Sequence, residues 1–214
     1  MYIDTHCHLS SEDYDDIDNV IEDNKKALVD KIIVSGCSRE SIDEVMVLKE
    51  KYDMVYVTIG YHPEYADIIT LDDLDYLEGL LRESKVVGIG EIGLDYHYGK
   101  GNKEKQLWLF ESQLKIAEEL SLPVVIHSRD ATQDTIDTLK KYNVKGIVHC
   151  FSGSLEVANI YISMGFLLGI GGVVTFKNSK LKDVVKEISL EKIVLETDSP
   201  YLTPVPYRGK VNSS

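Results

Sequence analysis

The chain has 214 residues, with 23 Lys and Arg against 36 Asp and Glu, so its formal net charge is −13. Hydrophobic residues make up 43% and charged residues 28%, which is typical of a globular domain and excludes a disordered chain. No apolar run approaches the roughly 18 residues of a membrane span, and the first residues lack a signal-peptide pattern. The acidic balance argues against non-specific coating of nucleic acid, but not against an enzyme that meets nucleic acid through metal ions.

The three cysteines, Cys7, Cys37 and Cys150, are far apart and show no CxxC spacing. An odd number of widely spaced cysteines is typical of a reduced compartment. We therefore expect a cytoplasmic protein without a membrane segment, in which the cysteines serve as small apolar residues.

Short β-branched runs recur along the chain and alternate with segments of helical periodicity. The runs predict strands at residues 2–5, 31–35, 54–59, 86–90, 124–127, 146–149, 166–169 and 193–196. Apolar residues with i, i+3, i+4 spacing predict helices at residues 17–29, 41–52, 71–81, 107–117, 131–142, 155–164 and 179–188. Thr70 is the expected N-cap of the third helix.

Eight strands and seven helices in strict alternation predict a (β/α)8 TIM barrel of eight parallel strands. A doubly wound open sheet is the alternative topology. No linker or change of composition divides residues 1–214, so we expect a single domain. The eighth strand is followed by a polar loop, so we expect the last outer helix to be missing.

Histidines and carboxylates stand where the predicted strands end. His6 and His8 follow the i, i+2 spacing that turns two side chains of a strand to the same side. The further candidates are Glu91, His127, His149 and Asp198. In a barrel the carboxyl ends of all strands open onto one face, where active sites are built. Six such ligands are too many for one tetrahedral ion but suit two divalent ions, Zn, Mg or Mn, that share a carboxylate.

Three more residues are candidates for contact with a substrate at the same mouth. Arg129 can pair with a phosphate or carboxylate oxygen, although it can equally cap a helix or neutralise Glu196. His62 stands before Pro63 and can contact substrate or stabilise a turn. Arg208 belongs to one of three basic groups expected around the mouth; the others contain Lys100, Lys103 and Lys105, and Lys177, Lys180 and Lys182. These groups favour an anionic polymer as substrate.

Residues 88–93 match the pattern G-x-G-x-x-G, but the context does not fit a dinucleotide site. That fingerprint needs a helix that opens within the motif and an acidic residue about 20 positions later, at the end of the next strand. Here a loop is predicted after Gly93, and the later position falls inside a helix. We therefore expect no dinucleotide cofactor. The chain also lacks a G-x-S-x-G elbow, so serine hydrolase chemistry has no support.

The motifs resemble those of the TatD family of metal-dependent deoxyribonucleases, over the whole chain and in the family's order. The matching segments are IDTHCH at 3–8, GYHP at 60–63, GEIGLDY at 90–96, Gln106 with Phe110 and Gln113, PVVIHSRDA at 123–131, HCFSG at 149–153, ETDSPYL at 196–202 and PYRGK at 206–210.

This resemblance implies a function and a ligand scheme. His6, His8 and Asp198 would hold one divalent ion, His127 and His149 the other, and Glu91 would bridge them. A metal-activated water, with Asp198 as base, would cleave phosphodiester bonds of DNA, at single strands or 3′ ends, as a 3′→5′ exonuclease or endonuclease. D-aminoacyl-tRNA deacylation is also associated with the family.

Two other interpretations remain open at this stage. One is a metal-dependent amide or ester hydrolase on the same barrel; many such relatives bridge their metals with a modified lysine where Glu91 stands here. The other is a shortened, inactive metal-binding chain, because the family continues past residues 208–210 with further helix. We expect that a missing helix exposes an apolar flank of the first and eighth strands.

Overall fold

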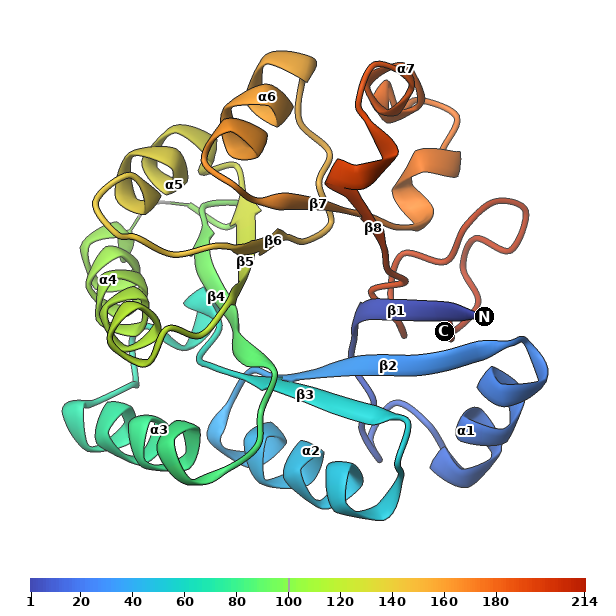
Figure 1. Cartoon of the computed structure of the whole chain (residues 1–214), viewed down its shortest axis with the longest axis horizontal. Helices are drawn as coiled ribbons and strands as arrows, with labels where there is room; N and C mark the ends of the chain where they lie inside the picture. The colour runs from blue at the N-terminus through green and yellow to red at the C-terminus, as the bar shows by residue number, and fades with distance from the viewer. Residues whose placement is uncertain (100) are drawn as a thin grey trace.

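The computed structural model describes residues 1–99 and 101–214 and is drawn in Figure 1. Eight parallel strands form one sheet in which every strand lies next to its predecessor in the chain. The strands are β1 (Tyr2–Cys7), β2 (Val29–Gly36), β3 (Val55–Ile59), β4 (Gly88–Asp95), β5 (Val124–Arg129), β6 (Gly146–Val148), β7 (Leu167–Ile170) and β8 (Ile193–Leu195). The predicted (β/α)8 barrel is therefore confirmed.

A helix follows each of the first seven strands on the outside of the barrel (Figure 1). The α-helices are α1 (Ile17–Lys26), α2 (Arg39–Lys51), α3 (Leu71–Glu83), α4 (Lys103–Leu120), α5 (Thr132–Leu139), α6 (Leu155–Ser163) and α7 (Leu181–Lys186). Short 3-10 helices cover Pro63–Tyr65, Gly172–Thr175 and Leu190–Lys192. Among the described residues, no helix is long and apolar enough to cross a membrane.

Local signals explain where the helices begin. Thr70 caps α3 as predicted: its hydroxyl accepts the Asp73 N–H, and the Asp73 carboxylate accepts the Thr70 N–H, which completes a capping box. The predicted helix at 179–188 is shorter in the structure. It covers only Leu181–Lys186, because Ser179 and Lys180 precede it without helical structure and the chain turns at Glu187 and bends at Ile188.

β4 is longer than predicted and begins two residues later. It continues past Glu91 to Asp95 and pairs in register with β5, so that Gly93 faces His127 and Asp95 faces Arg129. The predicted loop after Gly93 is therefore wrong for residues 94 and 95. Gly93 has φ of 150°, and a Cβ there would lie 1.9 Å from the His127 carbonyl oxygen, so only glycine lets the two strands approach this closely.

Polar contacts close the barrel between β8 and β1. The Asp198 N–H donates to the His6 carbonyl at 3.0 Å, and the His8 N–H donates to the Ser199 carbonyl at 2.7 Å. Asp4 strengthens this junction from inside, because its carboxylate accepts the Thr197 hydroxyl and the N–H groups of Thr197 and His6. The junction thus fixes two of the predicted ligands, His6 and Asp198, relative to each other.

No described residue forms a helix after β8; residues 196–214 follow the strand as loops and turns. The ring of helices is open between α7 and α1, where both termini lie (Figure 1). Tyr2, Ile3 and Leu195 are exposed on the strands at this opening.

We predict that Asp4→Ala lowers the free energy of unfolding by about 3 kcal/mol. The substitution leaves the buried N–H of His6 and the part-buried N–H of Thr197 without their acceptor, and each lost buried partner costs roughly 1–3 kcal/mol. Thr5→Ala is the matched control, because it removes one exposed hydrogen bond of the same junction, from Thr5 Oγ1 to Leu195 O. Urea unfolding of both variants measures the difference; equal losses would contradict a special role for Asp4.

Candidate metal centre

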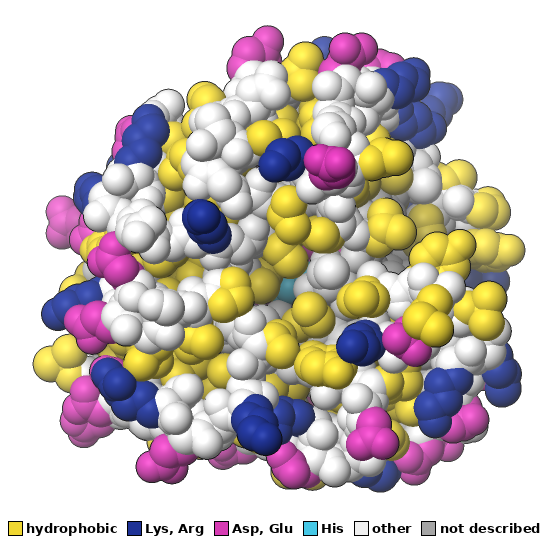
Figure 2. All heavy atoms as spheres, in the orientation of Figure 1, with side chains coloured by type: hydrophobic (Ala, Val, Ile, Leu, Met, Phe, Trp, Pro, Cys, Tyr) yellow, Lys and Arg dark blue, Asp and Glu magenta, His cyan; other side chains and the backbone are white. Residues whose placement is uncertain are grey.

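The six predicted ligands come together at the carboxyl ends of the strands. His6 lies in β1, Glu91 in β4 and His127 in β5, while His8, His149 and Asp198 follow β1, β6 and β8. Their ligand atoms form overlapping groups in which the atoms lie within 4.8 Å of one another: His6, His8 and Glu91; Glu91, His127 and His149; and His6, His149 and Asp198. In the view of Figure 2, a histidine side chain is visible deep in the centre of the molecule, ringed by hydrophobic side chains.

The Glu91 carboxylate occupies the middle of this arrangement. Its Oε1 lies 2.6 Å from His127 Nδ1 and 2.6 Å from His149 Nε2. Its Oε2 lies 3.4 Å from His6 Nε2 and 3.7 Å from His8 Nε2. One oxygen therefore faces each pair of histidines, which is the geometry expected of a carboxylate shared by two cations.

Asp198 approaches from the opposite side of the first pair. Its Oδ1 lies 3.5 Å from His6 Nε2 and 3.6 Å from His8 Nε2. The His6 and His8 rings are edge to face, with centroids 5.0 Å apart. The i, i+2 spacing thus brings both imidazoles to the same two carboxylates, as predicted from the sequence.

Two buried imidazole nitrogens have no hydrogen-bond partner among the described residues: His6 Nε2 and His149 Nδ1. Buried polar atoms are normally satisfied, so each unpaired nitrogen calls for an explanation. Imidazole nitrogens and carboxylate oxygens that converge in a buried site are the donors that Zn²⁺ and Mn²⁺ accept. The chain's own residues therefore fit divalent cations, with Glu91 between them.

The protonation states show how strongly this site attracts positive charge. Burial works against ionisation of Glu91, yet His149, His127 and His6 outweigh it and hold the pKa of Glu91 well below its usual value. Burial also opposes ionisation of Asp198, but its contacts with His6 and His8 lower its pKa. Burial alone would depress the pKa of His127, but Asp95 and Glu91 raise it to about 9. Without metal, the raised pKa values of His6 and His127 let these two imidazoles balance the carboxylates, whereas burial lowers the pKa of His149; bound cations would replace that positive charge.

Asp95 is a site residue that the sequence interpretation missed. Its Oδ2 lies 3.1 Å from His127 Nε2, on the side of the ring opposite Glu91. A carboxylate in this position fixes the orientation of a metal-ligating imidazole. Asp95 could have been found by extending β4, because residues 91 and 95 share one face of a strand.

His62, predicted as a substrate contact, lies against the same cluster. Its Nε2 is 3.7 Å from Glu91 Oε1, and its ring centroid is 4.5 Å from that of His127. Burial lowers the pKa of His62 to about 4, so the imidazole is neutral at physiological pH. Its Nδ1 also accepts the Glu64 N–H, so the alternative turn-stabilising contact exists as well.

Glu196 is buried behind the ligands. One carboxylate oxygen accepts the Cys150 N–H, next to His149 in the chain, while Oε2 has no partner among the described residues. Burial raises the pKa of Glu196 to about 8. Gly169 leaves the space for this carboxyl group, because a Cβ there would lie 2.0 Å from Glu196 Oε2.

The basic residues around the mouth differ in how free they are. Arg129 is exposed at the end of β5, with its guanidinium 5.9 Å from the Tyr98 ring centroid. Arg208 stacks on Phe176 at 4.0 Å and donates to the Thr203 carbonyl, so its contacts lie within the loop region after β7 and β8. Lys103 and Lys105 pair with Asp134 and Asp67; Lys100 lies outside the described residues.

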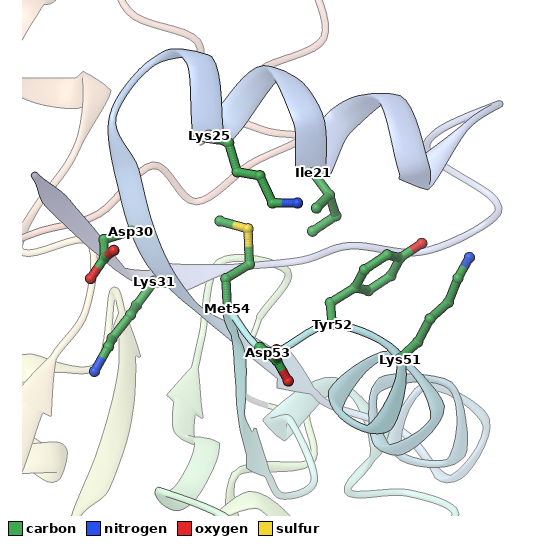
Figure 3. Close-up of a pocket in the computed structure, with 8 residues that line it drawn as sticks. All are labelled: Ile21, Lys25, Asp30, Lys31, Lys51, Tyr52, Asp53 and Met54. Carbon is green, nitrogen blue, oxygen red and sulfur yellow. The ribbon is translucent and has the colours of Figure 1, made fainter.

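A cavity of about 460 Å³ lies far from these ligands in the fold, between α1 and the amino ends of β2 and β3 (Figure 3). Ile21 and Met54 point toward each other there, with Lys25, Lys51 and Asp53 around them. Lys25 and Lys51 are already paired with Glu22 and Asp18. This cavity contains none of the predicted site residues.

Residues 3–214 match the family model described as TatD related DNase. The chain belongs to the TatD family of metal-dependent hydrolases. It is 48% identical to "Uncharacterized metal-dependent hydrolase YabD" of Bacillus subtilis, over 99% of this chain and 85% of the relative. It is 36% identical to "Deoxyribonuclease Tat-D" of Schizosaccharomyces pombe, over 87% of this chain and 64% of the relative.

Solved structures agree with the fold. The crystal structure of YJJV, a TatD homologue from Escherichia coli, matches with a TM-score of 0.90 and 35% identity, over 99% of this chain and 84% of that one. A mutant organophosphorus hydrolase matches with a TM-score of 0.63 but only 8% identity, so it supports the barrel alone. The resemblance drawn from the motifs is therefore confirmed at the level of the family.

We predict that Mn²⁺ or Zn²⁺ raises the melting temperature of the metal-free protein, increasingly with the logarithm of the ion concentration. Binding to the folded state alone stabilises it by about 2.7 kcal/mol at 100 times Kd. Glu91→Gln removes the shared carboxylate and should abolish most of this shift. The control is Asp183→Asn, an exposed carboxylate on α7. Differential scanning calorimetry checks this; an undiminished shift in Glu91→Gln would contradict the assignment.

Proposed function

We propose that this TatD-family chain hydrolyses phosphodiester bonds of DNA at a site for two divalent cations. The observation that carries the proposal is the buried Glu91 carboxylate, which faces His127 and His149 with one oxygen and His6 and His8 with the other. Two cations held a few ångströms apart suit an in-line displacement at phosphorus, because they stabilise the charge on the attacking and leaving oxygens.

The cations, when bound, lower the pKa of water and polarise the scissile phosphate. Asp198 is ionised, since its pKa is lowered by His6 and His8, and it is partly open to the mouth. We assign it the role of the base that accepts the proton of the attacking water. Glu91 would hold the cations through its two carboxylate oxygens, and Asp95 orients the His127 ring through its contact with Nε2.

Substrate contacts are assigned to residues at the rim. Arg129 is exposed and has no ion pair among the described residues, so its guanidinium is free to pair with a phosphate oxygen. His62 is neutral and lies beside Glu91, where it can donate to substrate. Arg208 is a weaker candidate, because its guanidinium already stacks on Phe176.

Two considerations favour DNA over a small amide or ester. The bridging position at β4 holds Glu91, not the lysine common in barrel amidohydrolases. In addition, one relative, from Schizosaccharomyces pombe, is named a deoxyribonuclease.

All three cysteines are free thiols, which supports a proposed cytoplasmic location, where DNA is accessible and disulfides are rare.

We predict that Asp198→Asn lowers kcat for cleavage of a 3′-labelled single-stranded oligonucleotide by at least about 100-fold, the usual effect of losing a general base. The rate is measured with Mg²⁺ or Mn²⁺ and without added metal. Circular dichroism and metal analysis establish that the variant is folded and loaded, and Asp183→Asn serves as the matched carboxylate control.

The outcomes separate the alternatives. Metal-dependent cleavage by the wild type that is lost in Asp198→Asn supports the proposal. A folded, metal-loaded wild type that cleaves no oligonucleotide but hydrolyses esters, amides or D-aminoacyl-tRNA would replace DNA as the substrate. Near-normal cleavage by Asp198→Asn would overturn the role of Asp198.

A further inference from the structure

A second cavity lies beside the metal centre and is not used by the chemistry described so far. It has a volume of about 240 Å³ and opens between the loops that follow β5 and β6, against α6. His149 contributes to its wall, so the cavity adjoins the cluster of ligands directly. Arg129 is at its rim, while Ser128, Phe151, Val157 and Tyr161 contribute to its lining. The volume is below the range typical of sites for drug-sized ligands and suits a single ring system.

Tyr161 is the unexpected part of this wall. The residue is 1% exposed, and its hydroxyl has no hydrogen-bond partner among the described residues. Its ring is fixed by edge-to-face contacts with Phe151 and Phe166, at centroid distances of 6.4 Å each. A buried hydroxyl without a partner destabilises the folded state, and phenylalanine would fill the same space without this cost.

The Tyr161 hydroxyl is close to a second polar group of the cavity. Burial raises the pKa of Tyr161, and the nearby Ser128 side chain acts in the opposite direction, although no hydrogen bond joins the two hydroxyls. Ser128 Oγ lies 3.0 Å from Thr135 Oγ1, which itself donates to the Ala131 carbonyl. The wall between β5 and α6 thus combines two hydroxyls with the apolar side chains of Val148, Phe151 and Val157.

The charge of the lining favours a neutral ring over an anion as the ligand of this cavity. Arg129, at the rim, is the one basic residue of the lining besides His149, and Asp130 contributes a negative charge. A phosphate group inside would lose its water against valine and phenylalanine without gaining a matching positive charge. A flat, neutral ring with polar atoms on its edge can pack against the apolar wall and hydrogen-bond the hydroxyls.

We propose that this cavity, named here the β5–β6 pocket, binds the nucleobase of a nucleotide next to the scissile phosphate, with the Tyr161 hydroxyl as a hydrogen-bond partner of the base edge. This rests on the proposed hydrolysis of DNA. The neighbouring phosphate then lies toward Arg129 and the metal centre. The pocket places a polynucleotide at the cations through its base, while the cations act on its backbone.

The test compares oligonucleotides that carry a base or an abasic residue on either side of the cleaved bond. For the wild type, removal of the base at one of these positions should raise KM at least about 5-fold, as expected from lost packing and hydrogen bonding. In Tyr161→Phe, KM for the intact oligonucleotide should rise about 3- to 10-fold, the effect of one lost hydrogen bond. The difference in KM between intact and abasic substrates should therefore be smaller in Tyr161→Phe than in the wild type.

The melting temperature distinguishes a tyrosine that binds a ligand from one that only stabilises the fold. Tyr161→Phe should keep or raise the melting temperature, because it removes an unpaired buried hydroxyl. Tyr142→Phe, a tyrosine outside the β5–β6 pocket, is the matched control and should leave KM unchanged. A lower melting temperature with an unchanged KM for Tyr161→Phe would overturn the proposal.

The same oligonucleotides, with a methylphosphonate at the central linkage, separate this proposal from that of hydrolysis. Their binding is measured by fluorescence anisotropy for wild type and Tyr161→Phe. Base-dependent binding without cleavage of any DNA would overturn the proposed function but support the pocket. Cleavage with equal KM for intact and abasic substrates would support the function and overturn the pocket, as would binding that ignores the base.

Discussion

The contact on which the rest of the site depends is that of the Glu91 carboxylate with histidines from three strands of the barrel. A carboxylate this buried would normally be protonated, but surrounding imidazoles keep it ionised. The ionised Glu91 carboxylate in turn helps to raise the pKa of His6 and His127. A single acid on β4 thus joins the ends of β1, β5 and β6 electrostatically. Bound cations would take over the role of the protonated imidazoles.

Such a site tolerates little movement, and the barrel supplies the necessary rigidity. The ligands on β4 and β5 are held by the pairing of these strands, whose register shifts between Ile89 and Ile92 around Glu91, and in which Gly93 permits a close approach to His127. Those on β1 and after β8 depend on a junction of a few hydrogen bonds, in which Asp4 takes part. The hydrogen bonds that close the barrel therefore also position the candidate ligands His6 and Asp198, because Asp4 and His6 belong to the same strand.

The sequence was sufficient to predict the barrel and the convergence of the six candidate ligands, and the reasons are physical. Alternation of buried strands with amphipathic helices leaves few other topologies, and the carboxyl ends of the strands must meet at one face. His6 and His8 could be paired from their spacing alone. The predicted fourth strand ended at residue 90, so Asp95 fell outside it. The strand continues to Asp95 because it pairs with β5, and this pairing requires the glycine at position 93. Glu196 was visible as a neighbour of Asp198, but its burial and its contact with Cys150 depend on tertiary packing.

The unpaired buried polar atoms show where this chain gives up stability. Five described residues carry such side-chain atoms: His6, Asn24, His149, Tyr161 and Glu196. The two histidines are within the metal centre, Glu196 is directly behind it, and Tyr161 lines the β5–β6 pocket beside it. Nothing in the structure explains Asn24, on α1.

Unsatisfied polar groups that arise by chance would be scattered through the core, whereas four of these five residues surround one mouth. His6 Nε2, which faces Glu91 and Asp198, points to a cation as its missing partner, and the phenol points to a neutral hydrogen-bonding group. Cations would be the first kind of partner, and an anionic backbone that they attract, joined to uncharged polar rings, would bring the second, which is consistent with the polynucleotide proposed as substrate.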